Sequence, residues 1–177
     1  IFMFSKFDNK IQSALKKFGL TQSTLIQQSS IDKILAGMNC LLVSETGTGK
    51  TLAALLPIFH LWLKNKPNPI SILYITPMKS LNRDMLDHLI HWGRELEMEV
   101  TVRHGDTSQY ERKMQQEFPH DMMIITLETL QPILFGKKIR EHLRNVKYVI
   151  IDEVHEIADS KRGVQLSIAL ERLKELC

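Results

Sequence analysis

Short apolar runs alternate along this chain with stretches in which apolar residues recur every three or four positions. The runs have the length of β-strands: Cys40–Val43, Ile70–Thr76, Val100–His104, Met122–Thr126 and Tyr148–Asp152. Strands that alternate with helical segments pack as a parallel sheet, because the helices that cross over between them cover its faces. The pattern predicts an α/β fold over residues 1–177 as a single domain, a largely parallel sheet with helices on both faces.

Three helices are predicted between and after these strands. The clearest has one buried stripe at intervals of three and four, formed by Leu81, Met85, Leu89, Trp92 and Leu96. Another is expected from about Gly49 to Leu63, broken or kinked near Pro57, and a last one from Val164 to Leu176. Residues 66–69, Lys-Pro-Asn-Pro, predict a turn before the second strand.

Composition limits the kind of protein without identifying it. Hydrophobic residues make up 44% of the chain and charged residues 24%, which is ordinary for a globular protein. The longest apolar runs are too short to span a membrane, and no cleavable signal pattern opens the chain. Cys40 and Cys177 have no metal or redox spacing, and Cys40 is expected to pack as a small apolar residue. A cytoplasmic location follows, and a net charge of +3 permits nucleic-acid binding.

A glycine-rich segment, Ser44–Thr51, follows the first apolar run and opens a helical stretch. This is the context of a phosphate-binding loop, in which backbone N–H groups and a helix N-terminus surround phosphate oxygens. Lys50 is expected to reach the β- and γ-phosphates, and Thr51 to bind Mg²⁺. The candidate nucleotide-binding residues of the loop are Thr46, Gly47, Thr48, Gly49, Lys50 and Thr51. The alternative is a glycine-rich turn with an exposed lysine.

A pair of acidic residues, Asp152 and Glu153, ends the last apolar run. Carboxylates at the carboxyl end of a parallel strand lie at the edge of the sheet where ligands bind. Asp152 is expected to hold Mg²⁺ through water, and Glu153 to orient and deprotonate the attacking water. Taken alone, such a pair also fits a solvated helix N-terminus.

Together, the segments Gly47–Thr51 and Asp152–His155 resemble the motifs of superfamily 2 helicases of the DExH kind. The resemblance implies a RecA-like P-loop NTPase domain that binds ATP and Mg²⁺ and couples hydrolysis to movement on a nucleic-acid strand. It also implies that Lys50, Asp152 and Glu153 are catalytic, and that His155 takes part in coupling between domains.

Further segments fit the same family in order. Residues 25–27, Leu-Ile-Gln, resemble its Q motif, which implies that Gln27 reads adenine; an amide can pair with the N6/N7 edge of that base. The alternative is a surface glutamine in a polar run.

Three more segments resemble motif Ia and the two parts of motif Ib, which contact the nucleic-acid backbone. They are Thr76–Asn82 and the pair His104–Thr107 and Thr126–Leu130, with Leu127 where the family often has proline. Backbone phosphates can be bound there by hydroxyl, amide and lysine groups at a helix start. The implied contacts are Thr76, Pro77, Lys79, Ser80, Asn82, Gly105, Asp106, Thr126 and Thr129. An ordinary helix start and a plain turn are the alternatives.

More narrowly, the sequence resembles the large helicase-related (Lhr-type) branch. The segments that carry this are Lys79–Asn82, Arg103–Thr107 and Ser160–Gly163. The branch implies a 3′-to-5′ translocase that separates DNA or DNA–RNA duplexes. The competing functions are a P-loop ATPase unconnected with nucleic acid and a nucleotide-binding regulatory or scaffold domain.

The resemblance covers the chain from about Phe18 onward. Residues 1–17 are expected to be a lead-in segment or an extraneous remnant, and Ile1–Gln12 carry no motif. The implied partners are a nucleic-acid strand and a second RecA-like domain, absent from these 177 residues, that supplies a catalytic arginine. We therefore expect the 177 residues alone to bind nucleotide but hardly to hydrolyse it. No membrane partner is expected.

Overall fold

The computed structural model describes residues 3–158 and 161–177. The chain divides into two compact units, Ile1–Lys66 and Pro67–Cys177, and each is described here by itself. Ser160, one of the residues that carry the Lhr-type resemblance, lies outside the described residues, as do Ile1 and Phe2.

The first unit is helical in its described part. Its elements are the 3₁₀ turn η1 (Phe4–Lys6) and the helices α1 (Asn9–Lys17), α2 (Leu25–Leu35) and α3 (Lys50–Asn65). Thr24 starts α2 through a capping box with Gln27, in which each side chain bonds the other residue's backbone N–H. The helix predicted from Gly49 is confirmed as α3, but it runs through Pro57 without a break.

The strand predicted at Cys40–Val43 is wrong. These residues form no ladder, and the side chains of Leu41 and Val43 are 75% and 79% exposed. A strand needs a neighbour for its backbone N–H and C=O groups, and residues 3–66 contain no other strand. The expected packing of Cys40 is also wrong, because this residue is exposed.

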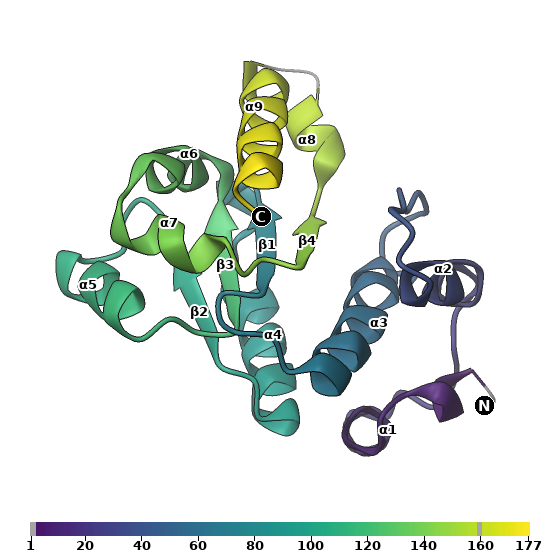
Figure 1. Ribbon diagram of the computed structural model, residues 1–177. Helices are drawn as coiled ribbons and strands as arrows, with labels where there is room; N and C mark the ends of the chain where they lie inside the picture. The colour runs from purple at the N-terminus through teal and green to yellow at the C-terminus, as the bar shows by residue number, and fades with distance from the viewer. Residues whose placement is uncertain (1–2, 159–160) are drawn as a thin grey trace. The chain divides into compact units, whose positions relative to one another are not determined.

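The second unit contains a parallel sheet of four strands. They are β1 (Ile72–Thr76), β2 (Val100–Arg103), β3 (Met122–Thr126) and β4 (Tyr148–Ile151), in the order β2-β3-β1-β4 (Figure 1). These four confirm the remaining strand predictions to within two residues at each end. The two central strands, β1 and β3, are buried along their whole length, as strands covered on both faces are.

Helices connect these strands and cover the sheet. They are η2 (Met78–Ser80), α4 (Arg83–Leu96), α5 (Gln109–Glu117), α6 (Leu127–Phe135), α7 (Lys138–Leu143), α8 (Val154–Ala158) and α9 (Lys161–Leu176). Alternate side chains of β1 and β3, such as Leu73 and Ile125, pack in one apolar cluster with α6, α7 and α9. In the order β2-β3-β1-β4, the connection through α4 leads from β1 to β2, whereas the later connections lead across the sheet in the opposite direction. Since such crossovers are right-handed, α4 lies on the face of the sheet opposite to α6 and α7. Helices on both faces are thus confirmed.

The predicted buried stripe of α4 is present, with Leu89, Trp92 and Leu96 each at most 1% exposed. Among the described helices, none has both the length and the apolar character needed to cross a membrane.

Candidate functional site

The four parallel strands of the second unit end at the same edge of the sheet. Thr76 at the end of β1 lies opposite Thr126 of β3, and Ile75 lies opposite Ile151 of β4. The segments that follow these strands therefore emerge side by side. The edge brings together the segments that resemble motif Ia and the second part of motif Ib with the segment Asp152–His155, here called the acidic box. Strand β2 brings the first part of motif Ib to the same edge.

Asp152 is held at this edge by two hydrogen bonds to its carboxylate. The hydroxyl of Tyr74 donates to Oδ2 at 2.6 Å, and the backbone N–H of Glu153 donates to Oδ1 at 2.9 Å. The N–H of Asp152 itself extends the ladder by donating to the carbonyl of Ile75 at 2.8 Å. With both oxygens engaged, the carboxylate has a defined orientation, which suits an ion ligand.

Tyr74 is a site residue that the sequence reasoning missed. It is 1% exposed, and burial together with the charge of Asp152 raises the pKa of its phenol well above the usual value of a tyrosine. The phenol therefore stays a proton donor to Asp152. The signal in the sequence was a phenolic hydroxyl within a mostly apolar strand, which does not reveal its partner.

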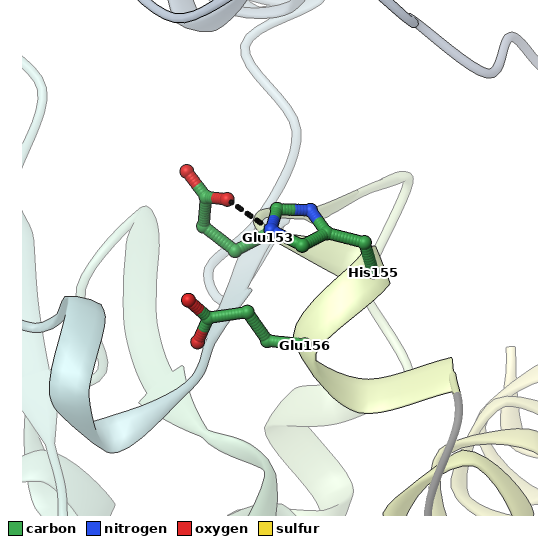
Figure 2. A group of neighbouring side chains, drawn as sticks. All are labelled: Glu153, His155 and Glu156. Carbon is green, nitrogen blue, oxygen red and sulfur yellow. Dashed lines mark ion pairs between the residues drawn. The ribbon is translucent and has the colours of Figure 1, made fainter.

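Glu153 lies at a sharp turn between β4 and α8. Its φ of +49° is in the left-handed region that non-glycine residues rarely adopt. Its carboxylate contacts Nε2 of His155 at 3.3 Å, an ion pair when the imidazole is protonated, and a carboxylate oxygen of Glu156 lies within 4.8 Å of both (Figure 2). The turn thus gathers three titratable side chains at the start of one short helix.

The phosphate-binding loop predicted at Ser44–Thr51 belongs to the first unit. Its glycines Gly47 and Gly49 have φ of +79° and +87°, and Gly49 leads directly into α3. The hydroxyls of Ser44 and Thr48 share a hydrogen bond of 2.6 Å. This hydrogen bond and the two positive φ angles shape a tight turn at a helix N-terminus, an arrangement suited to phosphate.

Lys50 directs its ammonium group back over this loop. Nζ donates to the carbonyl of Ser44 and, at 2.7 Å, to that of Glu45. Thr46 and Thr51 are exposed. The side chain of Lys50, which is predicted to contact phosphate, is therefore held over the loop by the backbone carbonyls of Ser44 and Glu45.

Gln27 lies beside the same loop. Its side-chain oxygen accepts from the N–H of Thr24 at 3.1 Å, and Nε2 donates to the carbonyl of Gly49 at 3.3 Å. The side chain is buried, at 4% exposure. The structure thus brings the residue resembling the Q motif to the phosphate loop, and its contact with adenine stays a prediction.

The residues predicted to contact nucleic acid differ in exposure. Lys79, Asn82, Gly105 and Asp106 are exposed and Ser80 and Thr129 are half-buried, whereas Thr76, Pro77 and Thr126 are buried. The Asn82 side chain caps α4 by accepting from the N–H of Met85 at 2.9 Å. The contact of these residues with a nucleic-acid strand stays a prediction.

Lys79 links the motif Ia segment to the helix that carries the end of the acidic box. Its Nζ lies 3.1 Å from Oε2 of Glu156. Both residues follow strands that pair with each other, β1 and β4.

Residues 24–177 match the model of a known family, described as DEAD/DEAH box helicase. The chain belongs to the DEAD/DEAH box helicase family. Within it, the chain is 40% identical over 169 residues to the ATP-dependent helicase Lhr-Core of Methanothermobacter thermautotrophicus, covering 86% of this chain and 20% of that protein. It is 34% identical over 176 residues to the Lhr helicase/uracil glycosylase of Escherichia coli, covering 88% and 11%.

The fold of this DEAD/DEAH box chain matches a solved Lhr structure. The Mycobacterium smegmatis helicase Lhr, bound to ssDNA and AMP-PNP, superposes with a TM-score of 0.85 and 32% identity, covering 98% of this chain and 23% of that one. The RecA-like fold and the Lhr-type resemblance are thereby confirmed. The chain spans about one fifth of the length of the Lhr-Core relatives it matches.

Proposed function

We propose that this chain is the ATP-binding domain of an ATP-dependent helicase or translocase. The observation that carries the proposal is the loop Ser44–Gly49, where two positive-φ glycines lead into the N-terminus of the 16-residue helix α3. Such a loop presents backbone N–H groups to phosphate oxygens. The family and the fold support the same function, since the relatives are named ATP-dependent helicases.

The residues of the loop are proposed to hold the triphosphate. The backbone from Thr46 to Gly49 contacts phosphate oxygens, and Lys50 exchanges its bonds to loop carbonyls for the β- and γ-phosphates. Gln27 is proposed to contact adenine. This exchange is physically reasonable because an ammonium bonds a phosphate more strongly than a neutral carbonyl.

The acidic edge is proposed to supply the chemistry of hydrolysis. Thr51 and Asp152 are each proposed as a ligand of Mg²⁺, since a hydroxyl and a carboxylate offer the oxygen atoms that this ion prefers, and it keeps part of its water shell. When bound, this ion neutralises charge on the phosphates. Glu153 orients the attacking water and accepts its proton, and Tyr74 keeps the carboxylate of Asp152 in place.

A nucleic-acid strand is proposed to lie along the exposed residues at the carboxyl edge of the sheet. These are Lys79, Asn82, Gly105 and Asp106 with the half-buried Ser80 and Thr129. Phosphate contacts of this kind fix position without reading sequence. The solved Lhr structure that this chain resembles is bound to ssDNA.

The remaining features belong to the whole protein. We propose that residues 1–177 form one domain, that a second RecA-like domain provides the catalytic arginine, and that His155 takes part in coupling the two. We further propose a cytoplasmic location.

Isothermal titration of ADP with Mg²⁺ tests the nucleotide site. Lys50→Ala should weaken binding roughly 10- to 150-fold, the worth of a hydrogen bond to a charged group. Glu153→Gln should bind nearly as the wild type does, because Glu153 acts on water. Lys64→Ala is the matched control, an exposed lysine at the other end of α3. Equal affinities for wild type and Lys50→Ala would show that the loop is not a phosphate site.

A further inference from the structure

Lys79 and Glu156 form an ion pair that joins the predicted strand-binding edge to the short helix in which the acidic box ends. Lys79 is on η2 and Glu156 on α8, and their side chains are 68% and 23% exposed. Oε2 of Glu156 is shielded from solvent and accepts no hydrogen bond from the described residues. The ammonium of Lys79, 3.1 Å away, is therefore the group that compensates the charge on this oxygen.

On its other side, Glu156 adjoins His155 and Glu153. One ligand atom from each of the three side chains lies within 4.8 Å of the others, and the imidazole contacts Glu153 at 3.3 Å (Figure 2). The imidazole of His155 thus lies near two carboxylates, and the one it contacts, that of Glu153, is the proposed base for water.

We propose that Glu156 is a positioning residue through which strand binding at Lys79 reaches Glu153. The inference rests on the proposed role of Lys79 in strand binding. Without a strand, Lys79 neutralises Glu156 and the imidazole stays with Glu153. A backbone phosphate draws Lys79 away, which leaves a shielded carboxylate oxygen without a cation. Glu156 then competes for the imidazole, and Glu153 is released to act on water.

The size of the effect follows from the exposure of the pair. An ion pair with one largely exposed member contributes little, so its loss to a phosphate changes affinity about two- to fivefold. An effect of this size allows Lys79 to exchange between Glu156 and a backbone phosphate, and it is large enough to measure.

A double-mutant cycle on single-strand affinity tests the competition. The probe is a dye-labelled oligothymidylate, and its dissociation constant is measured by fluorescence anisotropy at low salt. Glu156→Gln should tighten binding about two- to fivefold because Lys79 is freed, and should have no effect in a Lys79→Ala background. Glu141→Gln is the control. Glu141, on α7, pairs with Arg144 just after that helix, and its replacement should be neutral in both backgrounds.

The outcomes separate this inference from the proposed function. If Lys79→Ala weakens binding but Glu156→Gln tightens it equally in both backgrounds, the effect is general electrostatics and the competition is refuted. If Lys79→Ala leaves affinity unchanged, the strand-binding role of Lys79 is wrong and the inference falls with it.

The second step of the proposal, in which the imidazole of His155 moves from Glu153 toward Glu156, is measured separately. The ring signals of His155, assigned by their loss in His155→Gln, should shift in NMR spectra when oligothymidylate is added to wild type. They should shift much less in Glu156→Gln, because a neutral amide accepts a hydrogen bond from the imidazole N–H more weakly than a carboxylate does. Equal shifts in both proteins would overturn this step.

Discussion

Replacing Gly49 with alanine should destabilise the first unit for two separable reasons. At a φ of +87° an alanine carries a penalty of roughly 1–2 kcal/mol. Its Cβ would also lie 2.7 Å from Nε2 of Gln27, closer than real contacts allow. The buried amide would have to move, and a polar group left without its hydrogen bond costs about 1–3 kcal/mol. The expected loss for Gly49→Ala is therefore about 2–5 kcal/mol of unfolding free energy.

Gly37→Ala separates the two terms. Gly37 has nearly the same φ, +83°, but an added Cβ would meet no atom within 4 Å. This variant should lose only the backbone part, about 1–2 kcal/mol. Urea unfolding followed by Trp62 fluorescence reports on the first unit, in a background where Trp92 is replaced by phenylalanine so that one tryptophan remains. If the two alanine variants were equally destabilised, the close approach of Gln27 would not be what requires glycine at position 49.

Two further predictions concern the second unit. Because burial and Asp152 raise the pKa of Tyr74, the folded state keeps a proton that the unfolded chain releases above about pH 10, so stability falls there by up to about 1.4 kcal/mol per pH unit. Tyr74→Phe should show a smaller fall in urea unfolding at alkaline pH; an unchanged pH dependence would contradict the raised pKa. Lys79→Ala should lower the slope of log affinity for oligothymidylate against log salt by about 0.7, the loss of one phosphate contact, and an unaltered slope would remove Lys79 from the interface.

The four strands of the sheet could be predicted from their apolar side chains. Met122–Thr126 is an unbroken apolar run, and the structure buries it on both faces with the predicted bounds. The run Cys40–Val43 has the same character but forms no strand. Side-chain pattern reports what a segment can bury, and it says nothing about whether a neighbouring backbone is present to share hydrogen bonds.

The candidate site was predictable to the extent that its residues are close in sequence. The spacing of Gly47, Gly49 and Lys50 was enough to predict the loop, because a turn that leads into a helix depends only on residues close in sequence. The bond between Tyr74 and Asp152 joins positions 78 residues apart. It depends on β4 lying beside β1 in one register, which the crossover helices determine and no local pattern shows.

At Glu153, the left-handed backbone favours one residue type for stability and the proposed chemistry requires another. A glycine there would adopt the φ of +49° without the roughly 1–2 kcal/mol that a side chain costs, so the fold alone favours glycine. A glycine, however, has no carboxylate to serve the water proposed to attack the γ-phosphate. A procedure that redesigned this chain for stability alone would be drawn to replace Glu153, and the more stable protein would have lost its proposed base.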